Sequence, residues 1–346
     1  MDTISGGNNT TILSIGLDDF IALSIFFPTT LFGFIVYTLF VVVVYITKDY
    51  RTNPYYMLAA ALGICDCLTL LCFLVYSSAC IAAGEQLGGF LVNKLVGSVV
   101  EGCWYGSMPL ICALAINRYY CVCRRGEYNM VFTKFRTYVA IAISFAYGIG
   151  YLVAGLFWCC DFLFIPHEYS WQWDVNKAGG LFITQSEMAV TSIVVIIAGI
   201  CNCIVFRVYR RQHHEIEHDN EDARQERVHR EREFKLFVQF FVIVLWMTFF
   251  DLMFVVAPFV PSSKWFLLII TMMYVIHCSI NGWVYVAMNK SLRKKIGKMI
   301  NFWGSKSSGG NNVTQIPNDS QIKVAHITSQ AKLANSTPLV VQNLEK

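Results

Sequence analysis

One short pattern in the sequence is typical of metal catalysis. Residues 214–218, His-Glu-Ile-Glu-His, match the pattern in which two histidines one helical turn apart hold zinc and a glutamate acts as the general base. Such a site also needs a third ligand and a dry cleft. The pattern instead lies within residues 207–235, where eight basic and eight acidic residues alternate. We interpret it as a solvated charged segment, and we expect no metal, no cofactor and no enzymatic activity.

Ionisable and polar residues inside apolar stretches are the stronger candidates. Asp66 is the only charged residue of its stretch, and His277 and Asn281 lie four residues apart in the last one, on one helix face. A charge in hydrocarbon is costly, so such residues are functional candidates by default. We expect Asp66, His277 and Asn281 to form an intramembrane polar switch with two hydrogen-bond arrangements. A static, fully bonded core is the alternative.

A second set of candidates combines acidic and aromatic residues. They lie in the outer half of the expected helix bundle. Ligand pockets between helices are lined mainly by apolar and aromatic side chains with a few polar groups. Helix packing, or an aromatic belt at headgroup level, is the alternative, above all for Trp171, Trp173 and Trp265. The candidate pocket residues are Glu101, Trp104, Tyr105, Glu187, Asp251 and Tyr274.

Seven apolar stretches must position these residues. Each is at least about 20 residues long, enough for a helix to cross a bilayer of ~30 Å. Charged residues make up only 14% of the 346-residue chain, against about 25% in soluble domains. The expected fold is therefore an all-α membrane protein, a seven-transmembrane helix bundle. The stretches cover roughly residues 20–46, 55–83, 95–117, 137–160, 184–206, 236–260 and 265–289.

A basic amphipathic stretch follows the seventh apolar stretch. Leu292, Ile296, Ile300 and Trp303 recur at helical spacing among Lys and Arg. That pattern is typical of a helix lying on a membrane surface, in contact with lipids.

The distribution of basic residues predicts the orientation. Alternate loops hold 24 of the 27 Lys and Arg on one side and three on the other, so the N-terminus is expected outside. Glycosylation sequons at Asn8 and Asn9 then lie outside. We expect an extracellular tail over residues 1–19, a receptor domain over 20–303 and a disordered cytoplasmic tail over 304–346. A disulfide from Cys80 to Cys159 or to Cys160 stays open.

Three motifs resemble those of rhodopsin-like G-protein-coupled receptors. Asn117-Arg118-Tyr119 resembles their Asp-Arg-Tyr, residues 281–285 (Asn-Gly-Trp-Val-Tyr) their Asn-Pro-x-x-Tyr, and residues 62–66 (Leu-Gly-Ile-Cys-Asp) their Leu-Ala-x-x-Asp. Together with residues 53–57 (Asn-Pro-Tyr-Tyr-Met), they are most similar to nematode serpentine chemoreceptors, class T most closely, with class X a close relative. The resemblance implies that Asn117, Arg118, Tyr119, Asn281 and Tyr285 serve activation and G-protein coupling.

The resemblance also implies partners and a location. The expected partners are an extracellular ligand, a heterotrimeric G protein and membrane lipids, and no nucleic acid is expected. The expected location is the plasma membrane, and the membrane of a sensory cilium is one candidate. Departures from the family include Asn117 in place of an acid and Gly282 in place of proline. A seven-helix ligand-gated channel of the insect olfactory type and a peptide or neurotransmitter receptor are the alternative functions, and a transporter is a third. The charge split opposes the channel, whose N-terminus is inside.

Overall fold

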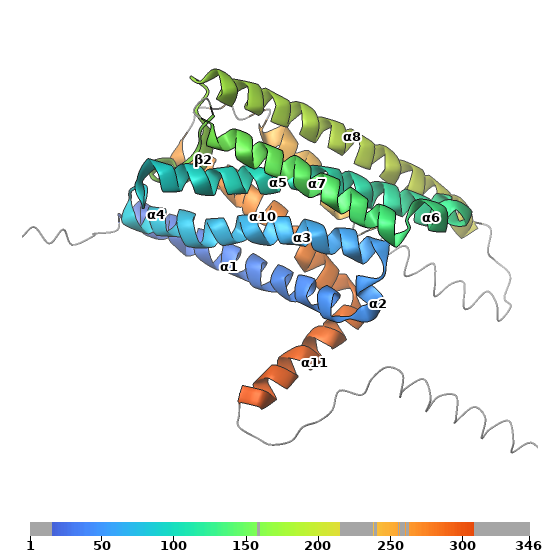
Figure 1. Ribbon diagram of the computed structural model, residues 1–346. Helices are drawn as coiled ribbons and strands as arrows, with labels where there is room; N and C mark the ends of the chain where they lie inside the picture. Colours follow the sequence, from blue (N-terminus) through green and yellow to red (C-terminus); the bar gives the residue numbers. More distant parts are fainter. Residues whose placement is uncertain are drawn as a thin grey trace, which may run out of the picture. The chain divides into compact units, whose positions relative to one another are not determined.

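The seven apolar stretches form helices that lie side by side in a bundle (Figure 1). This computed structural model describes residues 16–157, 160–214, 238, 241–254, 256, 260 and 263–307. Six described helices are long and apolar enough to cross a membrane, and a shorter apolar helix covers Phe241–Phe254. The expected all-α, seven-helix fold is thereby confirmed.

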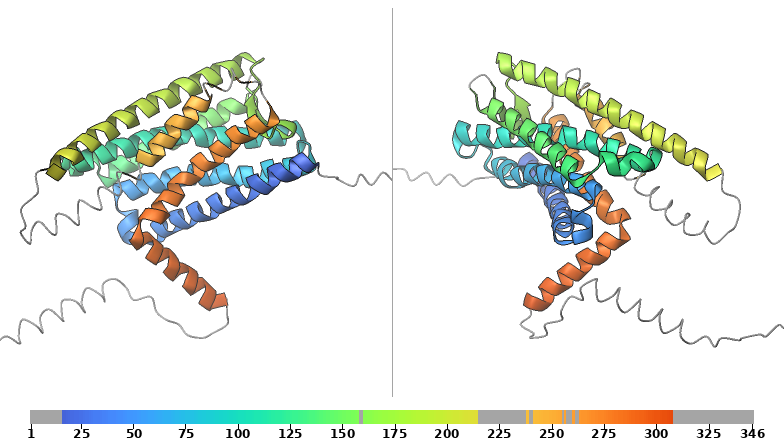
Figure 2. Two further views of the ribbon diagram at one scale, coloured as in Figure 1. Left: turned by 180° about the vertical axis from the view of Figure 1, so that it is seen from behind. Right: turned by 45° about the vertical axis from the view of Figure 1, so that its right-hand side comes forward.

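The helices alternate in direction along the chain (Figures 1 and 2). The membrane-length elements are α1 (Leu17–Ile46), α3 (Pro54–Cys72) running through a π-helical turn η1 (Phe73–Ser77) into α4 (Ser78–Ala83), α5 (Gly89–Cys123), α7 (Lys134–Leu156), α8 (Ala178–His214) and α10 (Lys264–Met288). Short helices α2 (Lys48–Arg51) and α6 (Arg125–Val131) lie at one end of the bundle, which we call the basic end.

The opposite end carries a β-hairpin that the sequence did not suggest. Strands β1 (Phe162–Ile165) and β2 (Ser170–Trp173) pair antiparallel, with Phe162 opposite Trp173, and a 3₁₀ turn η2 (Pro166–Glu168) joins them. Tyr169 completes the turn with a left-handed backbone (φ 55°). We call this end of the bundle the hairpin end.

Local sequence signals fix where several helices begin. The side chain of Asn53 accepts a hydrogen bond from the Tyr55 N–H (3.0 Å) ahead of α3, and Thr133 caps α7 in the same way. Ser263 accepts from the Phe266 N–H (3.2 Å) at the start of α10. Side-chain oxygens at these positions satisfy N–H groups that a helix leaves unpaired in its first turn.

Glycines allow close helix packing at two interfaces. A Cβ on Gly148 of α7 would lie 2.4 Å from the Gly102 carbonyl oxygen of α5. A Cβ on Gly282 of α10 would lie 2.8–2.9 Å from atoms of Tyr37 on α1. Helices without side chains at the contact approach backbone to backbone, which is how membrane helices gain packing energy. Gly282, where the motif that the sequence resembles has proline, thus provides a close α1–α10 contact.

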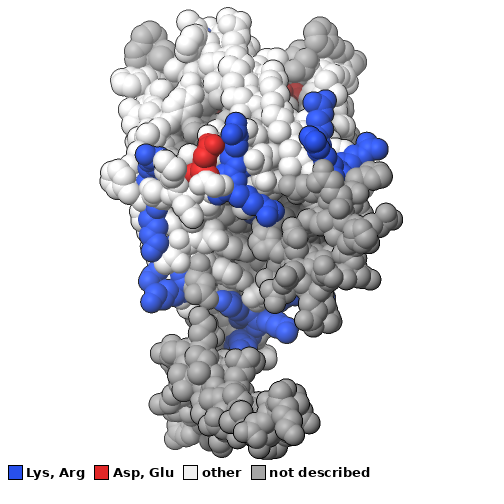
Figure 3. Space-filling model, turned by 90° about the vertical axis from the view of Figure 1, so that its right-hand side faces the viewer, with Lys and Arg blue, Asp and Glu red and all other residues white. Residues whose placement is uncertain are grey.

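Charges gather at the basic end. Figure 3 views the bundle from that side and shows Lys and Arg over most of its described charged surface. Exposed Lys48 and Arg51 belong to α2, and exposed Lys134 and Arg136 to the start of α7. This is the charge asymmetry that the loop counts predicted.

The last described helix, α11 (Lys290–Ser307), begins directly after α10. The Asn289 side chain accepts from the Leu292 N–H (3.1 Å) and so caps its start. Leu292 and Ile296 are buried, whereas Lys290 and Arg293 are exposed, as an amphipathic helix requires. The chain divides into two units after Gly297. The amphipathic helix is confirmed, and its contact with lipid stays a prediction.

Candidate functional site

At the basic end, Arg118 is covered by an aromatic ring. Its guanidinium carbon lies 3.4 Å from the ring centroid of Tyr55 on α3, and the residue is only 6% exposed. An arginine over an aromatic face is held by the ring's negative quadrupole, and the attraction grows when water is excluded. In this packing, therefore, Arg118 of α5 is turned onto α3.

Tyr55 connects Arg118 to the end of α10. Its ring stands edge-on to Tyr285 (6.1 Å between centroids), and Tyr285 stacks on Phe40 of α1 (4.6 Å). Arg118, Tyr55, Tyr285 and Phe40 come from four helices, and we call them the basic-end cluster. Beside them, Asn289 donates to the hydroxyl of Tyr56 (3.0 Å).

The two neighbours of Arg118 face other elements. The Asn117 side chain is buried and donates to the Tyr128 hydroxyl of α6 (3.2 Å). Tyr119 packs with Val122 and Val205 between α5 and α8. Of the residues predicted to serve coupling, the structure thus brings Arg118 and Tyr285 into one cluster and places Asn117 and Tyr119 beside it.

In the middle of the bundle, Asp66 and Asn281 meet as expected. The Asn281 amide donates to an Asp66 carboxyl oxygen (3.3 Å), and both residues are buried. Tyr37 and Cys278 border the same carboxyl group. A carboxylate in hydrocarbon costs several kcal/mol unless it is hydrated, paired or protonated. The hydrogen bond from Asn281 therefore stabilises the packing of α3 on α10.

His277 does not join that pair. Its ring stacks on Phe250 of the helix Phe241–Phe254 (5.6 Å) and meets Trp104 of α5 edge-on (5.3 Å). The described residues show no hydrogen bond between His277 and Asp66, and the buried Nδ1 of His277 has no partner among them. His277 and Asn281 lie on one face of α10, but His277 contacts aromatic side chains whereas Asn281 contacts Asp66.

An aromatic cluster lies toward the hairpin end from the Asp66–Asn281 pair. Trp104 is its centre: it contacts Tyr274 (5.1 Å), Phe250 (5.8 Å) and His277, and Tyr274 meets Phe73 of η1 (5.2 Å). The indole N–H of Trp104 and the hydroxyl of Tyr274 are buried without a hydrogen-bond partner in the described portion of the chain. We call this group the outer cluster.

Two acidic residues stand beside the outer cluster. Glu101 lies one turn before Trp104 on α5, is 2% exposed, and its Oε1 has no hydrogen-bond partner among the described residues. Glu187 of α8 is close enough for the two carboxylates to repel each other, and the side chain of Trp173 on β2 lies beside its carboxyl group. Two like charges in such a place need a counter-charge or a proton.

The other two predicted pocket residues lie differently. Tyr105 faces away from Trp104, stacks on Tyr151 of α7 (3.4 Å) and bonds to Ser186 of α8 (3.2 Å), so it joins three helices. Asp251 is half-buried and accepts a hydrogen bond from Ser192 (3.4 Å), which ties the helix Phe241–Phe254 to α8. The structure brings Glu101, Trp104, Glu187 and Tyr274 together, whereas Tyr105 lies at a packing interface.

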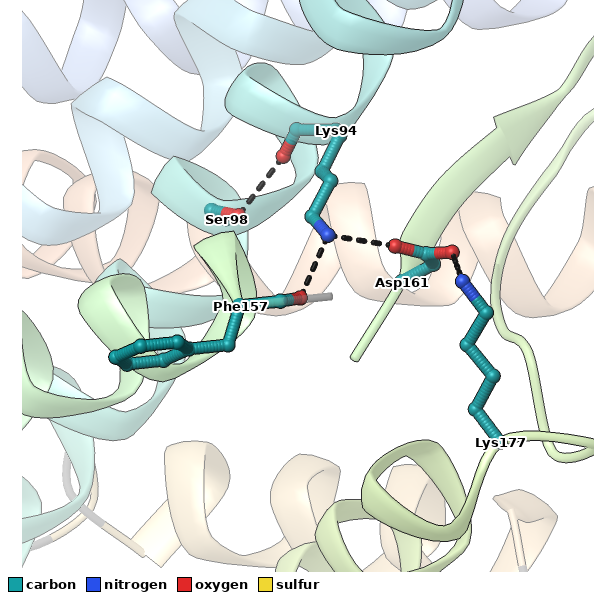
Figure 4. A network of polar contacts seen from close by, with 5 residues as sticks. All are labelled: Lys94, Ser98, Phe157, Asp161 and Lys177. Carbon is teal, nitrogen blue, oxygen red and sulfur yellow. Dashed lines mark hydrogen bonds and ion pairs between the residues drawn. The ribbon is translucent and has the colours of Figure 1, made fainter. Parts of the chain in front are cut away.

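Polar contacts anchor the hairpin to the bundle. Lys94 of α5 reaches the Phe157 carbonyl oxygen (2.6 Å) and one oxygen of Asp161 (2.8 Å), while Lys177 binds the other (Figure 4). Burial raises the pKa of the Asp161 carboxyl, but the hydrogen bonds and charges of Lys177 and Lys94 outweigh it, so that the pKa lies below its usual range.

Side chains also hold the strands themselves. Asn93 bonds to both the N–H and the carbonyl oxygen of Phe164 (2.9 Å each), and the Trp171 indole donates to Ser77 (3.1 Å). A Cβ on Gly97 would collide with the Phe162 carbonyl oxygen at 1.9 Å, so β1 lies directly on α5. Trp171 and Trp173 therefore belong to a structured hairpin that is held against α5.

Several predictions fall outside the described residues or find no support in them. Cys80 carries a buried thiol that is not bridged to Cys160, and Cys159 lies outside the described residues. The structure also does not describe the sequons at Asn8 and Asn9 or the charged segment of residues 215–235. No three His, Cys, Asp or Glu side chains in the described ranges could hold a metal.

The sequence reasoning missed some residues of these sites. Tyr55 belongs to the motif over residues 53–57, yet nothing in its spacing indicated that its ring would cover Arg118. Phe250 and Asn93 gave no signal, because their roles depend on contacts between helices far apart in the chain.

Seven apolar helices with a covered arginine at a basic end and a buried acidic–aromatic cluster at the other define a heptahelical membrane receptor. A family model described as Serpentine type 7TM GPCR chemoreceptor Srx matches residues 27–289, from α1 to the end of α10. The chain belongs to this family. Comparison with curated proteins gives no match.

The family match answers several of the sequence-based expectations. The protein is a multi-pass, serpentine G-protein-coupled chemoreceptor, not an enzyme, and such receptors work with an extracellular ligand and a G protein. The resemblance to nematode serpentine chemoreceptors is confirmed, with the match to Srx, and class T is not confirmed. The channel and transporter interpretations are not favoured.

Proposed function

We propose that the outer cluster binds the extracellular ligand and that α10 conveys its occupancy to the basic end. The observation that carries this is the position of Tyr274, His277, Asn281 and Tyr285 along one helix. Spaced by three or four residues, they follow one face. They contact, in turn, the outer cluster, Asp66 and the basic-end cluster.

The covered arginine indicates which state this packing represents. An arginine that binds a partner must offer its five N–H donors to it. Arg118 lies on Tyr55 and is almost without solvent contact, so its guanidinium is buried in the bundle. We therefore assign this packing to the resting receptor. Ligand binding shifts the equilibrium toward a second packing in which Tyr285 and Tyr55 separate and Arg118 reaches the G protein.

The receptor is placed in the plasma membrane, of a sensory cilium or elsewhere, with the hairpin end outside. Support comes from the 24-to-3 division of Lys and Arg and from the basic face in Figure 3. Residues 1–19 then form an extracellular tail with Asn8 and Asn9 open to glycosylation, and residues 304–346 a cytoplasmic tail that follows the receptor domain of residues 20–303.

An epitope-tag experiment tests this orientation. A tag before Asp2 should be stained on intact cells, and a tag after Lys346 only after permeabilisation. Nucleotide exchange on a co-expressed panel of G proteins, measured in the same cells, tests the coupling. The opposite staining pattern would place the outer cluster at the cytoplasmic side and refute the proposal.

A further inference from the structure

The membrane segments around the outer cluster carry more acidic than basic side chains. Glu101, Glu187 and Asp251 come from three different membrane segments, and those segments, with α10 from Trp265 onward, contain no Lys or Arg over residues 95–117, 178–206, 241–260 and 265–288. The nearest amines are engaged elsewhere: Lys94 and Lys177 with Asp161, and Lys264 with Asp18. No Lys or Arg in these segments therefore supplies a counter-charge for these acids.

Three buried hydrogen-bonding groups of the outer cluster and of Glu101 beside it have no partner among the described residues. They are Oε1 of Glu101, the indole N–H of Trp104 and the hydroxyl of Tyr274. Glu101 and Trp104 are at most 5% exposed. Leaving buried polar groups unpaired costs free energy, so a molecule that bonds to them would recover it.

The surroundings distinguish between kinds of cation. A metal ion needs several converging oxygen, nitrogen or sulfur ligands, and no such set occurs among the described residues. Aromatic rings surround the acids instead. The ring centroids of Trp104, Tyr274 and Phe250 lie within 5.8 Å of one another. Aromatic faces together with carboxylates are the groups that recognise organic ammonium ions.

We propose that the outer cluster binds a small organic cation, an amine or quaternary ammonium compound, whose charge is paired with Glu101 and Glu187 and whose body contacts Trp104 and Tyr274. This inference rests on the proposed function, because it takes the outer cluster as the ligand site. It names the ligand's chemical class: a cation with an apolar body small enough to lie between α5, α8 and α10.

The test uses full-length receptor in nanodiscs and a panel of amines. Each amine is paired with a neutral compound of the same shape, such as choline and its neutral tert-butyl analogue, and a set of carboxylic acids is added. Binding is read as an increase in melting temperature, which mass action produces for any ligand of the native state. G-protein activation in cells is read separately.

We expect at least one amine to bind while its neutral counterpart does not. Glu101→Gln and Glu187→Gln keep the shape of each side chain and should each weaken that amine by about tenfold or more, as the loss of a charged hydrogen bond predicts. Glu85→Gln, at an exposed position before α5, is the matched control and should leave binding unchanged.

Three results would overturn the proposal: silence of the whole amine set, binding confined to neutral or acidic compounds, or an amine whose affinity is the same in both Gln variants. Failure of the receptor function itself looks different. It would appear as amine binding that depends on Glu101 and Glu187 but activates none of the G proteins, even in a variant whose resting contact at Arg118 has been removed.

Discussion

Removing the aromatic face that covers Arg118 should make the receptor active without ligand. The change is Tyr55→Leu, which keeps an apolar side chain on α3 but has no ring for the guanidinium 3.4 Å away. A cation–π contact of a desolvated arginine is worth about 2 kcal/mol, which is roughly a 30-fold change in an equilibrium constant. For a receptor whose active packing is populated at about 1%, the active fraction rises to about one fifth.

The assay is ligand-free nucleotide exchange on the coupled G protein, at matched surface density of receptor. Tyr55→Phe is the control, because it retains the ring and should stay near the wild-type level. Adding Arg118→Ala to Tyr55→Leu should return exchange to background, since the released arginine is what the G protein binds. Unchanged basal exchange in Tyr55→Leu would show that the ring does not restrain Arg118, and the assignment of this packing to the resting state would fail.

Three further predictions test the other contacts. Arg118→Ala alone should reach the cell surface at near-normal levels and lose most G-protein activation; equal activation at equal expression would leave Arg118 as a topology charge only. Asp66→Asn and Asn281→Ala should each change signalling efficacy far more than ligand affinity, with a non-additive double mutant, because they share one hydrogen bond; additive effects on efficacy would exclude a joint switch. Asp161→Asn should loosen the hairpin at neutral pH, seen as faster amide exchange over residues 162–173. Because the folded-state pKa of Asp161 is lowered, its contribution is present above about pH 4 and is lost as pH falls through the folded-state pKa; protection that is equal in wild type and Asp161→Asn at neutral pH would contradict the anchor.

The sequence predicted the helices and one of the buried contacts well. Apolar length is decisive in a membrane, because every backbone group in hydrocarbon must be bonded within its own helix. A carboxyl group in hydrocarbon also needs a polar partner, and Asn281, a polar residue on the seventh membrane helix, was therefore a strong candidate partner for Asp66.

Contacts that depend on rotation of whole helices could not be predicted. His277 and Asn281 share a helix face, yet one lies against Trp104 and the other against Asp66, because α3 and α5 pack at different heights along α10. The hairpin was missed for another reason. Its strands have four residues each, too short for a clear alternating pattern, and they depend on Asn93 and Gly97 of α5 for their position.

Gly282 has a mechanical consequence for the whole receptor. A proline at that position would remove a hydrogen bond and bend the helix, giving it a hinge. With glycine, α10 runs unbroken from Lys264 to Met288. Tyr274 and Tyr285 are eleven residues apart, which is about 16 Å along a helix axis at 1.5 Å per residue. If the unbroken helix pivots where Gly282 touches Tyr37, a tilt of about 5° moves Tyr274, eight residues away, by about 1 Å and Tyr285, three residues away, by about 0.4 Å in the opposite direction. A ligand contact at Tyr274 then shifts the Tyr285 ring against the edge-on ring of Tyr55 without a flexible joint anywhere between Tyr274 and Tyr285.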